Sequence, residues 1–116
     1  MTTPLVYTLV IKHGPDQHDK QLRALRFAKA LCNRGHLLRR VFFYGDGVKT
    51  ILPSHSTMIA SWQKLVTPPN AQCELILCSA SAERLHVKSV PEHFVIGGLG
   101  SLIEAGFDSD RVINCD

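Results

Sequence analysis

The chain has 116 residues, of which 45% are hydrophobic and 20% charged, and its net charge is +3 at pH 7. This composition excludes an intrinsically disordered chain, and the length suits one domain with its own hydrophobic core. The mild positive charge permits contact with RNA or an acidic partner but predicts neither, because the chain has no dense cluster of lysines and arginines. We expect the densest basic spots, Arg23/Arg26 and Arg39-Arg40, to be solvated ends of a helix and a strand.

The first residues carry no basic flank before the apolar run at 5–11, so we expect no signal peptide. No apolar run approaches the roughly 20 residues that a membrane-spanning helix needs. We therefore expect a single domain over residues 1–116, located in the cytoplasm and without membrane contact. In that compartment the four cysteines are expected to be thiols rather than a disulfide framework.

The first half of the chain alternates between strand and helix patterns. Leu5–Ile11 is a dense apolar run, typical of a strand buried on both faces. Apolar residues at helical spacing predict a helix over Asp19–Asn33, and Gly35 is placed to end it. A second strand is expected over Leu37–Tyr44, followed by a short helix at 48–52.

The second half continues the alternation. We expect helices at 56–65, 80–85 and 101–105, and strands at 73–78, 94–96 and 111–115. Residues 97–100 predict a tight turn from strand to helix. Strands that alternate with helices through right-handed crossovers place the chain in the α/β class. The prediction is a single-domain parallel sheet of about five strands with helices on both faces.

Cys78 has the most informative position of the four cysteines. It closes the apolar run at 75–78 and is followed directly by the expected helix, with a serine free to cap that helix and Glu83 early in it. Open α/β sheets bind their ligands at the carboxyl ends of strands, and the amino end of a helix favours thiolate over thiol. Cys78 is therefore the candidate catalytic residue, and a buried structural cysteine is the alternative.

The other cysteines fit chemistry less well. Cys73 and Cys78 are on one expected strand about 16 Å apart and on opposite faces, so they cannot share a metal ion or a disulfide. Cys32 lies beside the apolar side of a helix and is expected to pack there. Cys115, near the end of the chain, has no helix end or basic neighbour to activate it. His13 follows the first strand, where it is either a donor to a Cys78 thiolate or a solvated loop residue.

The remaining motifs predict no cofactor and no metal. Residues 97–101 read Gly-Gly-Leu-Gly-Ser, which matches neither the dinucleotide fingerprint nor the P-loop. No G-x-S-x-G serine elbow is present, and the six histidines form no helical ligand pairs. Phe42, Phe43 and Tyr44 place a large aromatic surface near a strand end, which predicts that the chain assembles with other subunits.

Seven sequence blocks fall in order over nearly the whole chain, at 27–31, 35–36, 41–48, 62–65, 75–84, 98–105 and 110–112. Together they resemble the DsrE/TusD family of sulfur-carrier proteins. The resemblance implies a compact parallel α/β fold and a sulfurtransferase without cofactor. Cys78 matches the cysteine that carries sulfur as a persulfide in this family.

The resemblance also implies partners. TusD-like members form a hetero-oligomer with TusB- and TusC-like subunits and pass sulfur to a TusE-like acceptor during thiolation of the tRNA wobble uridine. DsrE-like members, with DsrF- and DsrH-like subunits and a DsrC-like acceptor, serve intracellular sulfur oxidation. In either branch an upstream donor protein supplies the sulfur, and we do not expect direct contact with tRNA. A non-catalytic structural subunit of such a complex is the remaining alternative.

Overall fold

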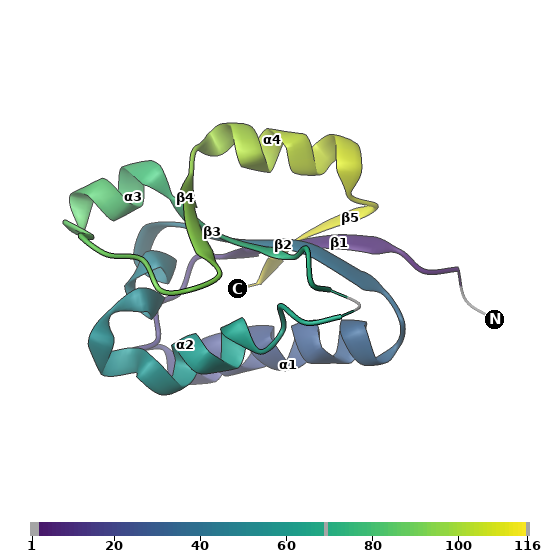
Figure 1. Ribbon diagram of the computed structural model, residues 1–116, viewed down its shortest axis with the longest axis horizontal. Coiled ribbons are helices and arrows are strands. Elements are labelled where there is room, and N and C mark those ends of the chain that lie inside the picture. Colours follow the sequence, from purple (N-terminus) through teal and green to yellow (C-terminus); the bar gives the residue numbers. More distant parts are fainter. Residues whose placement is uncertain (1–2, 69, 116) are drawn as a thin grey trace.

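A five-stranded sheet organises the computed structural model, which describes residues 3–68 and 70–115 (Figure 1). All strand pairs are parallel, and the order across the sheet is β4-β3-β2-β1-β5. The strands are β1 Val6–Ile11, β2 Leu37–Phe43, β3 Glu74–Cys78, β4 Phe94–Gly97 and β5 Arg111–Cys115. The predicted parallel sheet is confirmed, with strand bounds within one residue of those expected.

Helices cover both faces of this sheet, as predicted. The α-helices are α1 His18–Asn33, α2 Ser56–Gln63, α3 Ser79–Arg84 and α4 Leu99–Asp108; η1 Gly45–Ile51 and η2 Pro53–His55 are 3₁₀-helices. Helices α1 and α2 lie on one face and α4 on the other (Figure 1). Of the described residues, none belongs to a helix long and apolar enough to cross a membrane.

Three predicted helices differ in extent by more than one residue. The helix expected at 56–65 ends at Gln63. The segment expected as a helix at 48–52 is a 3₁₀-helix that already starts at Gly45. Helix α4 includes Leu99 and Gly100, which were predicted as part of a turn. Gly98 is the N-cap residue of this helix, a position where glycine is tolerated, so only Gly100 carries the cost of about 1 kcal/mol that glycine has inside a helix. The predicted loop around residues 67–70 includes position 69, which lies outside the described residues.

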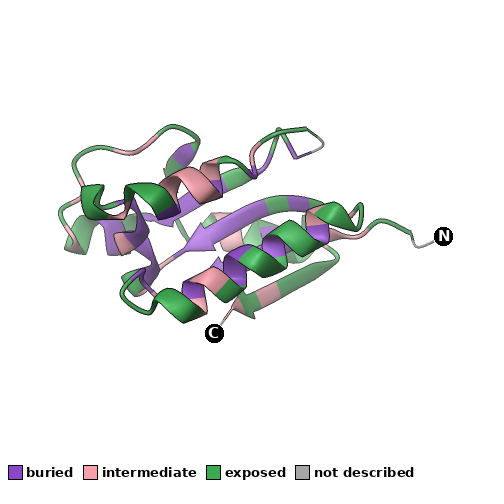
Figure 2. Ribbon diagram, turned by 90° about the horizontal axis from the view of Figure 1, so that it is seen from below, coloured by how far each residue is buried: buried purple, intermediate pink, exposed green. Residues whose placement is uncertain are grey.

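The core lies in the central strands, which are buried over consecutive residues instead of in alternation (Figure 2). Parallel strands covered on both faces have this pattern. Phe42 and Phe43 of β2 are fully buried, and the Phe43 ring packs edge-on against Trp62 at 5.4 Å. Only Tyr44 of the aromatic run is partly exposed. The prediction of an exposed aromatic surface at this strand end was therefore wrong, because β2 is an inner strand.

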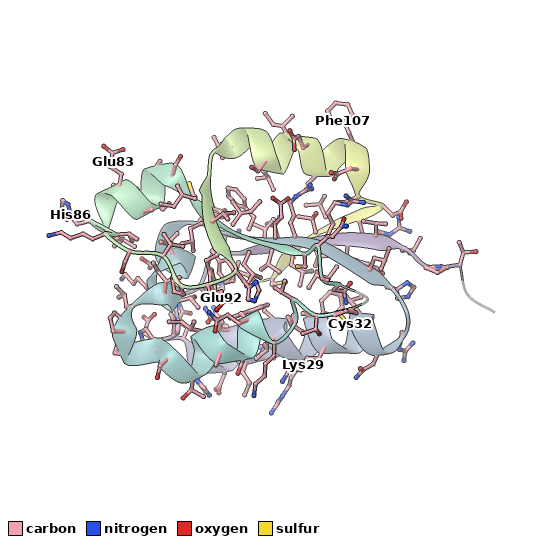
Figure 3. The ribbon with its side chains drawn as sticks, viewed as in Figure 1. Lys29, Cys32, Glu83, His86, Glu92 and Phe107 are labelled. Atoms are coloured by element: carbon pink, nitrogen blue, oxygen red, sulfur yellow. The ribbon has the colours of Figure 1, made fainter. Side chains whose placement is uncertain are left out.

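Exposed apolar surface lies instead on α4. Strands β4 and β5 are opposite edges of the sheet, so the connection between them crosses the whole face, and α4 makes this crossing. Ala105 is its one buried residue, whereas Leu99, Ile103 and Phe107 are 65%, 65% and 88% exposed. These three side chains follow at intervals of four residues and form one stripe. Phe107 points away from the sheet (Figure 3).

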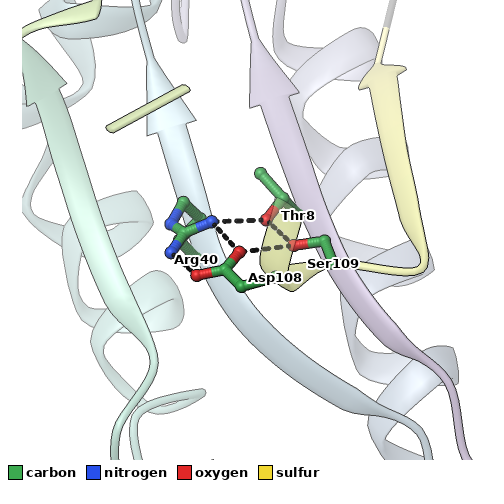
Figure 4. Close-up of polar contacts among 4 residues, drawn as sticks. All are labelled: Thr8, Arg40, Asp108 and Ser109. Atoms are coloured by element: carbon green, nitrogen blue, oxygen red, sulfur yellow. Dashed lines mark hydrogen bonds and ion pairs between the residues drawn. The ribbon is translucent and has the colours of Figure 1, made fainter. Parts of the chain in front are cut away.

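A polar network joins the end of α4 to the sheet (Figure 4). The guanidinium of Arg40, a residue only 3% exposed, donates to both carboxylate oxygens of Asp108 at 2.8 and 2.7 Å. The hydroxyls of Thr8 and Ser109 are hydrogen-bonded at 2.7 Å beside this pair. Arg40 is thus not the solvated residue predicted from the sequence, because its place on an inner strand buries it and Asp108 satisfies its charge.

Candidate functional site

Cys78 lies where the sequence placed it, at the carboxyl end of β3 and the amino end of α3. It is the last residue of the strand and also the N-cap residue of the helix, with non-helical backbone angles of φ −57° and ψ 123°. On the neighbouring strand β4 it pairs with Gly97, which has no side chain. Cys78 itself is 7% exposed. The Cys78 side chain is therefore largely shielded from solvent, at the carboxyl ends of the parallel strands.

The start of α3 differs from the prediction in two respects. Neither serine caps the helix, because the N-cap position belongs to Cys78. Glu83 is the fifth residue of this six-residue helix, in its last turn, and points away from the molecule (Figure 3). The helix begins at Ser79 and has only six residues. The sequence therefore placed the helix start one residue too late and Glu83 too early in the helix.

The surroundings of Cys78 favour its thiolate. Burial raises the pKa of the thiol, but the polar groups at the start of α3, namely the backbone N–H and hydroxyl of Ser81 and the N–H of Ala80, lower it together with the charge of Arg84. The lowering influences prevail, and the pKa lies below the ordinary value of a cysteine. An N-cap side chain commonly accepts hydrogen bonds from the second and third helical N–H groups, and Ala80 and Ser81 hold these positions. In this structure the Cys78 side chain makes no capping hydrogen bond to them.

Cys32 and Cys73 have the opposite character. Burial raises the pKa of Cys73 to about 12 and also raises the pKa of Cys32. The Asn70 side-chain amide donates to the Cys32 sulfur at 2.9 Å, and the Asn70 carbonyl accepts from the Cys73 N–H. Both thiols lie at the end of the sheet opposite to Cys78. The packing role expected for Cys32 agrees with this placement.

Cys115 is the last residue of β5, so it lies at the carboxyl ends of the strands, as Cys78 does. Strands β2 and β1 lie between β3 and β5, which separates the two strand ends by about 14 Å at the usual strand spacing. A disulfide needs Cα atoms within about 7 Å. All four cysteines lie in the described part of the chain, and no disulfide joins any two of them.

His13 is half-buried in the loop after β1, and its carbonyl oxygen accepts a hydrogen bond from the Gln21 side chain at 2.9 Å. Strand β2 separates β1 from β3, so the two strand ends are about 10 Å apart. The polar groups that act most strongly on the Cys78 sulfur come from α3 instead. His13 is neither fully solvated nor placed directly at the thiol.

Ser81 and Arg84 are functional candidates that the sequence reasoning missed. The Ser81 hydroxyl oxygen accepts hydrogen bonds from the Gly45 N–H at 2.8 Å and from the Arg84 guanidinium at 3.2 Å. Arg84 follows Ser81 by three residues on one helix, and this spacing was a signal that could have been used. Gly45 lies 36 residues earlier, and no sequence pattern indicates its contact.

No group of three or more histidine, cysteine, aspartate or glutamate side chains within residues 3–68 and 70–115 is placed to hold a metal ion. At the glycine-rich segment, Gly98 is the N-cap of α4 and Gly97 belongs to β4. A Cβ atom at Gly97 would approach the Ile76 side chain to 2.8 Å, so close packing requires glycine there. The segment serves as the strand-to-helix connection beside Cys78.

Comparison with known proteins gives a consistent result. Residues 6–115 match the model of the DsrE/DsrF-like family. The chain is 38% identical to a sulfurtransferase TusD homolog from Vibrio cholerae, over 95% of this chain and 97% of that protein. It is 32% identical to a protein named DsrE from Allochromatium vinosum, over 92% and 95% of the two chains. Among solved structures, the YchN protein of E. coli has the same fold, with a TM-score of 0.75 at 18% identity over 97% of this chain and 99% of that one.

Proposed function

This chain belongs to the DsrE/DsrF-like family, and from this premise we propose that it is a sulfurtransferase whose Cys78 carries sulfur as a persulfide. The relative from Vibrio cholerae is named as a TusD-type sulfurtransferase and aligns over nearly the full length of both chains. We further propose that the sulfur is destined for thiolation of the tRNA wobble uridine. The protein would do this work in the cytoplasm, where thiols stay reduced.

One observation carries the proposal, namely the contrast between Cys78 and the two cysteines at the other end of the sheet. The pKa of Cys78 is lowered, whereas the pKa values of Cys32 and Cys73 are raised. The thiolate is the nucleophile in sulfur chemistry, so at neutral pH Cys78 is better prepared than either of the others to accept sulfur.

The transfer step balances without an oxidant or a reductant. The Cys78 thiolate attacks the outer sulfur of a persulfide, R–S–SH, on an upstream donor protein. A new S–S bond forms at Cys78, the S–S bond of the donor breaks, and the donor leaves as the thiolate R–S⁻. Delivery is the same exchange with Cys78 as the donor and a partner's thiol, of the TusE or DsrC type, as the acceptor.

A relay of this kind requires that no internal cysteine resolves the persulfide. Cys115 shares the sheet edge with Cys78, but two strands lie between them. Gly97 pairs with Cys78 and is followed by Gly98, so no side chain from these two residues crowds the sulfur. These features support delivery to a thiol of another protein.

We also propose that the chain works within a hetero-oligomer of homologous subunits, of the TusB and TusC type. The exposed stripe of Leu99, Ile103 and Phe107 supports this, because soluble single chains rarely leave a helix with three such large apolar side chains uncovered. A partner subunit with a related fold would have helices of similar size, and one of them could cover this stripe.

The DsrE branch gives the second candidate function, transfer of sulfur during intracellular sulfur oxidation. The observation in its favour is the 32% identity to the DsrE protein of Allochromatium vinosum over 92% of this chain. The chemistry at Cys78 would be identical in the two branches, and only donor and acceptor would differ. Transfer assays with a TusE-like and a DsrC-like acceptor, run in parallel, distinguish them.

The test is to load the protein with a cysteine desulfurase and cysteine and to weigh it intact. We expect a gain of one sulfur atom, about 32 Da, that a thiol reductant removes. Cys78→Ser should fold, because serine is nearly isosteric and a good N-cap residue, but should gain no sulfur. Cys73→Ser is the matched control and should load normally. If Cys78→Ser still accepted and relayed sulfur at the normal rate, the proposal would be wrong.

A further inference from the structure

Helix α4 contains two glycines that no contact within the subunit requires. Gly100 and Gly106 are exposed, and a Cβ atom at either position would have no neighbouring atom within 4 Å. Neither residue has a positive φ. Glycine inside a helix costs up to about 1 kcal/mol relative to alanine, and close approach of another surface is a common reason for it. The two glycines therefore indicate that a surface outside this subunit packs closely on α4.

The glycines flank the exposed stripe of Leu99, Ile103 and Phe107 in a symmetric pattern. Each residue of an α-helix turns by about 100° and advances by about 1.5 Å. Relative to Ile103, Leu99 and Phe107 lie about 40° to opposite sides, four residues away in opposite directions. Gly106 lies about 60° to the side of Leu99, and Gly100 about 60° to the side of Phe107. Each large side chain thus has a glycine on its own side, toward the other end of the helix.

A second copy of α4, placed antiparallel across this surface, fits the pattern. A two-fold axis at Ile103 brings this residue against Ile103 of the other copy. Phe107 of one copy then lies over Gly100 of the other, and Leu99 over Gly106, and the symmetry repeats both contacts. Each large side chain therefore meets a position without a side chain. The surface is complementary to itself, which is the requirement for a two-fold interface.

The apolar surface continues from α4 onto the sheet. Val95 lies two residues before Gly97, whose Cβ atom would contact Ser101 of α4, so Val95 also faces the α4 side. Val112 pairs with Thr8, which faces this side in the network of Figure 4. Val95 and Val112 are 47% and 43% exposed. The two valines thus lie on the face of the sheet that α4 crosses.

The size and charge of this surface suit a dimer. The two valines and the three residues of the stripe together expose on the order of 500 Å² of side chain. Two copies would bury about 1,000 Å², the lower bound for a specific interface of good complementarity. Glu104 lies about 100° from Ile103, at the rim, and Asp108 is paired with Arg40. The centre of the surface is therefore uncharged, as in the core of an interface.

We propose that α4 packs against α4 of a second copy of this chain, antiparallel about a two-fold axis at Ile103. The inference rests on the proposed assembly and deepens it, because it names the subunit that covers the stripe of Leu99, Ile103 and Phe107. A hetero-oligomer built on this contact contains the chain in pairs.

Sedimentation velocity of the chain alone, over a series of concentrations, should show an equilibrium between monomer and dimer. Gly106→Leu should raise the dissociation constant about tenfold or more, because the new side chain occupies the space that Leu99 of the second copy needs. The subunit should still fold, since the Cβ position of Gly106 is open, and thermal unfolding checks this. Glu104→Ala, an exposed change at the rim of the same helix, is the control and should not weaken the dimer.

Disulfide crosslinking with copper phenanthroline tests the antiparallel arrangement. Ile103→Cys should crosslink to itself. Leu99→Cys and Phe107→Cys should each fail to do so, because identical positions four residues from the axis lie about 12 Å apart along the helices, beyond the roughly 7 Å between Cα atoms that a disulfide allows. A mixture of these two variants should crosslink. Peptide mapping separates these bonds from any that involve the native cysteines.

A chain that stays monomeric alone and with homologous subunits would overturn the inference. So would Ile103→Cys protein that crosslinks only to a different subunit, although the proposed hetero-oligomer would then stand. Crosslinks in the expected pattern, in a protein that loads no sulfur at Cys78, would instead overturn only the proposed function of that residue.

Discussion

Arg40 on β2 and Asp108 at the end of α4 form a two-pronged ion pair, with N–O distances of 2.8 and 2.7 Å. Arg40 is buried within the sheet, whereas Asp108 remains about one-third exposed at its surface. Within α4, Ala105 is buried and Leu102 packs partly buried against the core, and this ion pair is a further contact between the end of the helix and the sheet. The pairing keeps the pKa of Asp108 at about 2, chiefly through the hydrogen bonds from Arg40.

The first prediction concerns stability in acid. The pKa of Asp108 is lowered on folding, so its contribution is fully present above the unfolded value, about 3.9, and is lost as the pH falls through about 2. Asp108→Asn should remove that part of the pH dependence and cost about 1–3 kcal/mol at pH 7, because the Arg40 charge loses its partner. Urea unfolding of both proteins from pH 2 to pH 7 measures this.

Asp46→Asn is the control for this series. Asp46 pairs with Lys49 at 3.3 Å on the surface, and such exposed pairs contribute little. If Asp46→Asn and Asp108→Asn lost equal stability, or if the difference between Asp108→Asn and wild type were the same at pH 2 and pH 6, the role given to the ion pair would be wrong.

The second prediction is selective alkylation. With limiting iodoacetamide at pH 7, Cys78 should react before Cys73 and Cys32, because a lowered pKa gives it the larger thiolate fraction. The rate for Cys78 should reach half its maximum at a lower pH than the rates for Cys73 and Cys32. In denaturant the cysteines should react at similar rates. Labelling of Cys73 as fast as that of Cys78 in the folded protein would contradict the site geometry.

The third prediction concerns assembly through α4. Phe107→Ser and Ile103→Ser should leave the subunit fold intact, since both side chains are exposed, but should weaken association with homologous subunits. Sedimentation velocity and co-purification measure the change. Lys29→Ser on α1, which covers the other face of the sheet, is the control and should assemble normally. A wild-type chain that stays monomeric even when co-expressed with such subunits would rule the interface out.

The fourth prediction concerns the connection between β2 and the site. Gly47 packs against the carbonyl oxygen of Ile11, where a Cβ atom would collide with backbone. Gly47→Ala should therefore destabilise the protein by about 1–3 kcal/mol. Gly106→Ala is the matched control, because Gly106 is helical and has open space at its Cβ position, so a gain of about 0.5–1 kcal/mol is expected. Chemical denaturation of both variants checks the contrast, and equal effects would refute it.

Much of the fold could be predicted from the sequence because the relevant signals are local. The apolar run at Leu5–Ile11 and the strand bounds on either side of α1 follow from neighbouring residues alone. The position of Cys78 between β3 and α3 can also be predicted locally, because a short apolar run followed by helix-forming residues is enough to indicate it. Apolar burial in parallel strands is a property of each segment, so the sheet could be inferred without knowing its contacts.

Tertiary structure decided the features that depend on pairs of residues far apart in the chain. The burial of Arg40 depends on Asp108, 68 residues later, and the orientation of the Ser81 hydroxyl depends on Gly45, 36 residues earlier. The order of the strands also buried Phe43 and left Phe107 exposed, although both are phenylalanines in apolar segments. Local pattern determines which segments form strands and helices, but only the packing of those segments determines which polar groups meet and which apolar faces stay uncovered.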